Sequence, residues 1–350
     1  MTYTDVPVPS APERTALDVA TEPRLVRRAA VLGGLFVTVL VGSLLVVVEP
    51  VAAGLGLVGL LVVGVLMLRI AWTVLCYVAV EPFGDLVGGV VPEGVKLVGL
   101  LLFAAWLVRV LVDRRPVALR HPVVVAAGVL GTVVLAAFTL NPNGGVGVET
   151  AGRYGSYLAV LVVLVDTMRT TVPPRRVATV FLVACSGAAL VGLVGFLTEG
   201  GRAAGPMQDA NDFAFYLVCA LPFALLLWRD ARGWARVLPA TAVVLLVVTV
   251  CATFSRGALL GIAVMVVVAL ALGLLRLRDL GLAAAAVALG LGIVAVSVPD
   301  LVERSLAEKE FVADANVESR YTSWTLAAEM TLDHPVLGTG PGGRAQLSSP

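Results

Sequence analysis

The chain has 350 residues, of which 59% are hydrophobic and 14% are charged, and its formal net charge is +1. Soluble domains carry about 25% charged residues, so this composition and the mean hydropathy of +0.97 exclude a soluble enzyme, a disordered chain and a nucleic-acid-binding protein. Each bilayer crossing needs about 20 predominantly apolar residues. The sequence therefore predicts an all-α protein that crosses a membrane many times.

The chain divides into three predicted regions. Residues 1–23 are polar and rich in Pro and Thr, which predicts a disordered cytoplasmic tail. Residues 24–298 hold eleven apolar runs and form the predicted transmembrane domain, and residues 299–350 form the start of a large extracytoplasmic loop. The runs are Ala29–Val48, Val51–Leu68, Ile70–Val80, Val95–Val112, Pro122–Leu140, Tyr154–Val165, Val177–Leu197, Phe213–Trp228, Val237–Phe254, Ala258–Leu275 and Leu280–Val298.

The positions of the arginines predict the orientation. There are 23 Arg and two Lys, and an odd number of crossings with a cytoplasmic N-terminus puts 17 of the 23 arginines inside, as the positive-inside rule requires. This count needs the short run Ile70–Val80 to cross, because omitting it would invert every later loop. The six arginines left outside are Arg153, Arg202, Arg256, Arg304, Arg320 and Arg344.

Two short outer connections carry polar residues next to an arginine. The first, Glu199–Asp212, contains Arg202, and Asp209, Asn211 or Asp212 can cap the helix that follows. We expect these side chains to lie at the outer end of that helix.

The second connection, Thr253–Ala258, joins two spans with almost no loop, so Arg256 is expected on rigid backbone at the outer membrane boundary. Ser255 can cap the next helix. Gly257 is expected to permit a close backbone approach.

Each outer arginine has two interpretations. It can be an interfacial side chain that extends to the lipid headgroups, or it can bind phosphate, whose oxygens match the planar guanidinium in pairs. Spacing alone does not separate these for Arg256 or Arg202, whereas the interfacial interpretation is favoured for Arg153. The more informative feature is the set, since several arginines lie on one side against the charge rule.

The extracytoplasmic region contains a predicted helix and a Gly-rich loop. Ser319–Asp333 has an apolar face at helical spacing, formed by Tyr321, Trp324, Ala328 and Leu332. Pro335 should end this helix near His334. The loop Leu337–Gly343 has several glycines that can adopt positive φ, and its amides could hold an anion or could only form turns.

No metal or cofactor is expected. The four cysteines, Cys76, Cys185, Cys219 and Cys251, lie in apolar runs and are predicted to be small buried hydrophobic residues. The two histidines, His121 and His334, are too few for a His-rich metal site.

Three stretches resemble the bacterial O-antigen ligase and Wzy-type O-antigen polymerase family. Phe254–Ala258 is similar to its Ser-Arg-Gly signature. Gly205–Asn211 with Leu221-Pro222 is similar to its Gly…Asp-Pro-Asn…Leu-Pro pattern, although Ala210 stands where Pro is usual. The segment from Arg320 through Trp324 and His334 to Gly342 resembles the start of the large extracytoplasmic loop. The resemblance extends from about Val95 to Gly343.

The resemblance implies a metal-independent reaction at the outer side of the bacterial cytoplasmic membrane. A glycan carried on undecaprenyl diphosphate is transferred to an acceptor glycan or glycolipid, without nucleic acid as a partner. Arg202 and Arg256 are the first candidates to bind the diphosphate, followed by Arg320 and then Arg153.

The family also implies a general base, which is a histidine of the large outer loop that follows the Gly-rich stretch. The sequence ends at Pro350, and this histidine is expected beyond that residue. His334 is in the wrong place for the base. The chain is therefore expected to be C-terminally incomplete.

Other functions stay open. Polymerase and ligase are not separated, and a multi-spanning transporter or lipid flippase is an alternative. Transporters place ionisable groups near mid-membrane, whereas here charges collect at the outer rim. A non-catalytic scaffold of a polysaccharide-export complex is the third possibility, because the chain lacks the expected base.

Overall fold

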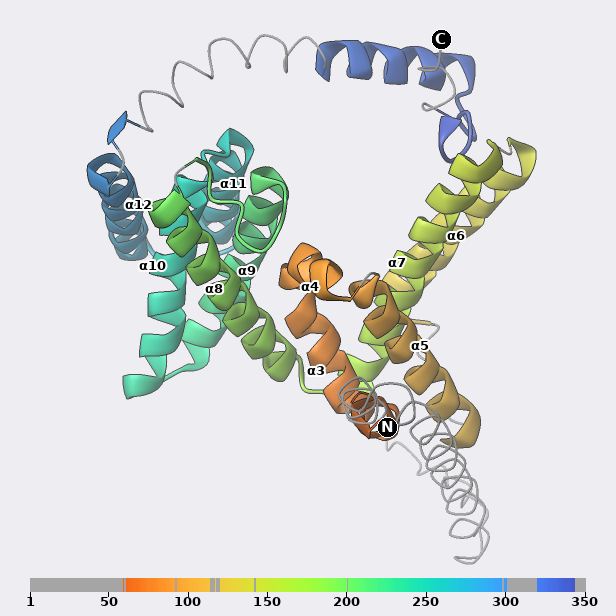
Figure 1. Ribbon diagram of the computed structural model, residues 1–350, viewed down its shortest axis with the longest axis horizontal. Coiled ribbons are helices and arrows are strands. Elements are labelled where there is room, and N and C mark those ends of the chain that lie inside the picture. Colours follow the sequence, from red (N-terminus) through yellow and green to blue (C-terminus); the bar gives the residue numbers. More distant parts are fainter. Residues whose placement is uncertain are drawn as a thin grey trace, which may run out of the picture. The chain divides into compact units, whose positions relative to one another are not determined.

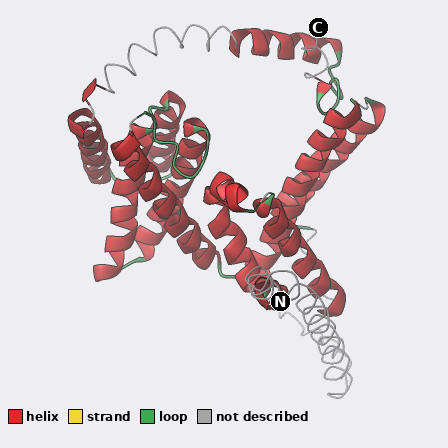
Figure 2. Ribbon diagram, in the orientation of Figure 1, coloured by secondary structure: helices red, strands yellow, loops and turns green. Residues whose placement is uncertain are grey.

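The computed structural model describes residues 59, 61–91, 93–113, 117, 120–141, 143–199, 201–297, 299–300 and 320–343. Regular structure in these ranges is helical (Figure 2). Residues 61–68 and 320–333 are helical as well. The labelled helices are α3 (Ile70–Val80), η1 (Glu81–Phe83), α4 (Gly84–Val90), α5 (Gly94–Asp113), α6 (Pro122–Leu140), α7 (Gly144–Thr170), α8 (Pro174–Glu199), α9 (Ala210–Asp230), η2 (Gly233–Arg236), α10 (Val237–Ala252), α11 (Arg256–Ala271) and α12 (Leu277–Ser297).

The prediction of a multi-pass all-helical membrane protein is confirmed at the level of helix length and composition. Each predicted run from Ile70 onward overlaps a helix, although the bounds differ for several of them. Seven helical stretches in the described ranges are long and apolar enough to cross a membrane, and two shorter apolar helices, Arg256–Ala271 and Ala284–Ile293, follow them. The predicted tail 1–23 and the run Ala29–Val48 lie outside the described residues, and Val51–Leu68 is described only in part.

The short run Ile70–Val80 is part of a longer helical stretch. Helix α3 has these bounds, and η1 and α4 continue it to Val90. Pro82 lies in the first turn of η1, where its missing N–H has no helical partner to lose. The combined stretch Ile70–Val90 has 21 residues, enough to span a bilayer.

Two compact units make up the chain. One consists of residues 1–69 and 104–117, and in its described part Arg109 pairs with Asp113 one turn along the helix, at 3.4 Å. The other consists of residues 70–103 and 118–350. In this second unit α10 packs against α8, α9 and α12, and α11 packs against α9 (Figure 1). Helices α6 and α7 form an antiparallel hairpin, and α3 contacts both α7 and α8.

The core of the second unit is built from small residues. Ala188 and Ala189 on α8 and Ala214, Ala220 and Ala224 on α9 are all fully buried. Small side chains let membrane helices approach closely, which is the main source of packing energy where lipid replaces water. The outer faces carry large apolar side chains that are about half exposed or more, including Trp72, Leu100, Leu130, Phe215 and Val267. Such a surface is suited to lipid rather than to water.

One aromatic ring connects this core to the 201–209 connection. Phe213, at the start of α9, is 0% exposed. A Cβ atom added to Gly192 on α8 would lie 2.6 Å from the ring, and one added to Gly205 would lie 2.5 Å from it. Gly205 also has φ +61°, which favours glycine. The ring therefore fills space that exists only because both positions lack a side chain.

Replacing Gly192 with Ala should destabilise the protein by about 1–3 kcal/mol, because the new methyl group overpacks the Phe213 site. The matched control is Gly195→Ala on the same helix, where a Cβ has open space within 4 Å. There the change should be neutral or stabilising by up to about 1 kcal/mol through helix propensity. Thermal unfolding of both variants in detergent measures the difference, and equal melting temperatures would contradict the packing assignment.

Candidate functional site

The α10–α11 turn is as short as the sequence predicts. Helix α10 ends at Ala252 and α11 begins at Arg256. The reversal takes place at Phe254, which has φ +51° although it is not glycine. A non-glycine residue in this region costs about 1–3 kcal/mol and persists only where its surroundings hold it. The Phe254 ring packs against Phe196 of α8, with ring centroids 6.3 Å apart, which helps to hold it.

Two hydroxyl groups complete the turn. Ser255 is the N-cap of α11, and its Oγ accepts a hydrogen bond from the Ala258 amide at 3.4 Å, as predicted. The buried Thr253 hydroxyl donates to the Val250 carbonyl and accepts from the Ser255 amide. Buried backbone groups need such partners in a membrane protein, where water does not supply them. These hydrogen bonds therefore fix the backbone of the turn that carries Arg256.

The 201–209 connection is bound to this turn. The Ala203 amide donates to the Ala252 carbonyl at 3.0 Å. Arg202 Nε donates to the Thr253 carbonyl at 2.8 Å, and its Nη2 donates to Asn211 Oδ1 at 2.9 Å. Arg202 therefore joins three pieces of chain: its own connection, the end of α10 and the first turn of α9. The structure brings Arg202 to the turn that carries Arg256.

The two arginines differ in how far they are engaged. Arg202 is exposed and uses two of the five N–H donors that a guanidinium carries. Arg256 is also exposed, and within the described ranges it makes no hydrogen bond or ion pair. The first turn of α11 adds backbone N–H groups and the positive end of the helix dipole, which favour an anion. Of the two, Arg256 has the more available guanidinium.

The 201–209 connection, the first turn of α9 and the α10–α11 turn together form an edge that also carries negative charge. Asp209 is the N-cap of α9, and its Oδ1 accepts from the amides of Asn211 at 2.6 Å and Asp212 at 3.0 Å. The hydrogen bond from the Asp212 amide, with that from Asn211 and the nearby charge of Arg202, holds the pKa of Asp209 below its ordinary value. Asp209 is the residue that caps α9, among the three that the sequence proposed.

A second contact ties the 201–209 connection to α4. The Gln208 amide donates to Asp85 Oδ2 at 2.8 Å, and the Leu86 amide donates to the Pro206 carbonyl at 3.3 Å. Tyr216 on α9 donates to Glu81 Oε2 at 3.0 Å in the same region. These partners follow no motif in the sequence, because they are distant in the chain and meet only through packing.

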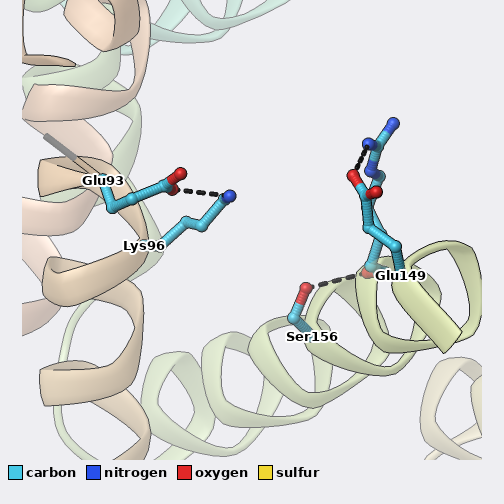
Figure 3. Close-up of polar contacts among 5 residues, drawn as sticks. Glu93, Lys96, Glu149 and Ser156 are labelled. Atoms are coloured by element: carbon cyan, nitrogen blue, oxygen red, sulfur yellow. Dashed lines mark hydrogen bonds and ion pairs between the residues drawn. The ribbon is translucent and has the colours of Figure 1, made fainter. Parts of the chain in front are cut away.

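Arg153 and Arg320 are not brought to this edge by any contact in the described part of the chain. Arg153 lies inside α7 and not in a connection, since the helix begins at Gly144 and the predicted start at Tyr154 is wrong. Its Nη2 pairs with Glu149 Oε1 at 3.0 Å, one turn earlier, and this pair supports the longer helix (Figure 3). Arg320 is the first described residue of the helical segment 320–333 and is exposed. The last two outer arginines, Arg304 and Arg344, lie outside the described residues.

The predicted helix near residues 319–333 is confirmed, but its apolar face is not buried. Tyr321 and Trp324 are each 70% exposed, and Leu332 is 80% exposed. The periodicity therefore predicts the helix correctly, whereas the described residues provide no core for its apolar side.

The two histidines lie at helix ends. His334 follows the helix 320–333, with its amide donating to the Met330 carbonyl, and its side chain is exposed. His121, for which no role was expected, caps α6 by accepting from the Val123 amide at 3.3 Å. The general-base histidine expected beyond Pro350 stays a prediction, because Pro350 itself lies outside the described residues.

The Gly-rich loop uses its glycines for packing. The amides of Gly338 and Gly343 already donate within the segment, to His334 and Gly340 carbonyls. Gly257 does not provide the expected close approach, because a Cβ there would have open space within 4 Å. Close approaches lie elsewhere, for example at Gly192, Gly205, Gly340 and Gly342. The described residues hold no group of three or more metal-ligating side chains.

Removal of the Asp209 cap should lower stability in a pH-dependent way. Because the folded-state pKa of Asp209 is depressed from 3.8, its contribution is fully present above that value and is lost as the pH falls through the lower folded-state pKa. Asp209→Ala should cost about 1 kcal/mol at neutral pH. Thermal unfolding at pH 7 and at acidic pH measures this, and a wild-type–variant difference that persists unchanged in acid would contradict it.

Comparison with known proteins supports the resemblance over the C-terminal part of the chain. The family model described as O-Antigen ligase (Wzy_C) matches residues 241–349, less than half of the chain. This range includes Arg256, Arg320, His334 and the Gly-rich loop, whereas Arg202 and Arg153 precede it. No curated protein and no solved structure matches the chain. Over residues 241–349, this multi-pass membrane protein is therefore similar to the O-antigen ligase family.

Proposed function

We propose that the protein joins glycans carried on undecaprenyl diphosphate to an acceptor sugar hydroxyl at the outer face of the bacterial cytoplasmic membrane, as a polymerase or a ligase. The observation that carries the proposal is Arg256, which is exposed and unpaired within the described residues on a rigid turn inside the matched segment. An exposed cation without a partner among the described residues, on a hydrogen-bonded turn, has N–H donors available for an anion, which is a lipid headgroup in the interfacial interpretation and a substrate in this proposal.

The chemistry explains why arginine is suited to the task. The acceptor oxygen bonds to the anomeric carbon, the bond from that carbon to the diphosphate oxygen breaks, and the hydroxyl proton passes to a base. Negative charge grows on the leaving diphosphate, and fixed cations that bind it more strongly in the transition state than in the ground state accelerate the step. In this proposal Arg256 binds the diphosphate. Arg202 assists with its remaining N–H groups, and the base is assigned to none of the described residues.

The proposed topology keeps the N-terminus in the cytoplasm and eleven crossings. Contacts between connections support the alternation from α5 to α12. Gln208 binds Asp85 of α4, in the part of the stretch Ile70–Val90 that is assigned to its outer end. Arg202 with Thr253 joins two connections assigned to the outside, as does Asn143 with Thr339. Arg175 and Asp230, paired at 2.6 Å, lie in connections assigned to the inside. In each of the four pairs, an even number of proposed crossings separates the two partners along the chain, so the proposed topology puts both partners on the same side of the membrane.

Arg256→Ala should lower glycan joining by about 100- to 1,000-fold while the protein stays in the membrane at its normal level, because one oxyanion-binding donor contributes about this much. Arg256→Lys should be intermediate, since it keeps the charge but loses the planar fork. Surface glycan in a deletion strain that carries each variant measures activity, with an immunoblot for membrane level. Arg232→Ala, at a position in the opposite connection, is the control.

Arg202→Ala should lower both joining and thermal stability, because Arg202 also holds the 201–209 connection to Thr253. Arg256→Ala should leave the melting temperature unchanged. Full glycan joining by Arg256→Ala would overturn the assignment of that residue.

A further inference from the structure

The α6–α7 turn forms a buried polar contact with the Gly-rich loop. Asn143 Nδ2 donates to the Thr339 carbonyl at 2.9 Å and to the Pro341 carbonyl at 3.0 Å. Asn143 is only 9% exposed. Asn141 adds a longer bond to the Gly338 carbonyl, at 3.4 Å. Figure 1 shows the segment that contains the loop beside the end of the α6–α7 hairpin.

Asn143 is not used as its position in the chain would suggest. It occupies the N-cap position of α7, where an Asn side chain normally accepts a hydrogen bond from the helix's own amides. Here it makes no such bond. Both hydrogens of its amide group point instead at two carbonyls of a segment that follows 196 and 198 residues later. Asn143 therefore does not cap α7, and its side chain binds the Gly-rich loop instead.

The two surfaces also match in shape. Gly340 has φ +79°, and a Cβ there would lie 2.5 Å from the Asn141 carbonyl oxygen. A Cβ on Gly342 would lie 2.9 Å from the Val146 side chain, and one on Gly147 would lie 3.2 Å from the Pro341 carbonyl. Side chains are thus excluded on both sides of the contact. This pattern is typical of a close-packed docking surface.

We propose that Asn143 is a positioning residue that fixes the Gly-rich loop on the α6–α7 turn, and that glycan joining depends on this attachment. The second clause rests on the proposed function. The helix 320–333 presents Tyr321, Trp324 and Leu332 to solvent in the described structure, so those side chains do not anchor the segment in a core. The directional bonds of Asn143 therefore set where this part of the matched family segment lies. Small misplacements of a reacting assembly reduce rates strongly.

Asn143→Asp separates the two roles that this residue could have. Aspartate caps a helix as well as asparagine does, so a capping role predicts no loss. An ionised carboxylate cannot donate to two carbonyls, so the docking role predicts release of the loop. Hydrogen–deuterium exchange of the full protein in detergent should then show peptides of residues 334–343 exchanging about tenfold faster, as expected for the loss of two hydrogen bonds. Unchanged exchange would overturn the proposal.

Glycine substitutions provide an independent test that leaves Asn143 intact. Gly340→Ala, which meets the Asn141 carbonyl, should release the loop as Asn143→Asp does. The matched control is Gly145→Ala in the same turn, where a Cβ has open space within 4 Å and exchange should stay as in the wild type. Equal exchange in the two glycine variants would contradict close docking.

Glycan joining is measured with the same variants in the deletion strain. Asn143→Asp should lower glycan joining by about 10- to 100-fold at a normal membrane level, and Gly145→Ala should not. Release of the loop with full joining would overturn the role in the reaction. If the wild type joins no glycan, the proposed function fails, and the exchange experiment still decides whether Asn143 holds the loop.

Discussion

The ring of Phe213 occupies the space that Gly192 and Gly205 leave open, and this contact limits where the 201–209 connection can lie. Phe213 belongs to α9, Gly192 to α8, and Gly205 to the connection itself, so the ring joins the helical core to this connection. Once this connection is held, the Ala203 amide reaches the Ala252 carbonyl and Arg202 reaches Thr253. The polar contacts of Ala203 and Arg202 thus depend on the apolar contact of Phe213 with the two glycines.

The two arginines differ in how far their guanidinium groups are engaged within the protein. Arg202 bonds Thr253 and Asn211, and its charge also contributes to keeping Asp209 ionised. Arg256 is held only through its backbone, by a turn that stores strain at Phe254. A cation whose position is fixed but whose donors are unused is preorganised for an anion, since no internal bond has to break when the anion binds.

The α6–α7 turn and the α10–α11 turn both satisfy backbone hydrogen bonds with side chains of the protein. In a membrane protein, irregular backbone must find partners within the protein wherever water is scarce. At the α10–α11 turn the partners are the hydroxyls of Thr253 and Ser255. At the α6–α7 turn they are the amide hydrogens of Asn143, which bind carbonyls of the loop. Both turns are short, and both hold a distant segment at the end of a helix pair.

The sequence alone determined the helical runs from Ile70 onward, the Ser255 cap, three candidates for the cap of α9, the abrupt turn at Arg256 and the similarity of the C-terminal part to a known family. These features depend on local hydrophobicity, capping chemistry and spacing, which are properties of residues close together in the sequence. It misjudged the start of α7, because glycines and a Glu149–Arg153 pair do not stop a helix that lipid and neighbouring helices support. Only the tertiary structure decided that Arg202 bonds Thr253, that Phe213 lies against two glycines, and that Asn143 binds the Gly-rich loop instead of capping its own helix. Those contacts join residues far apart in the chain, and no local pattern specifies which distant partner packing will bring within hydrogen-bonding distance.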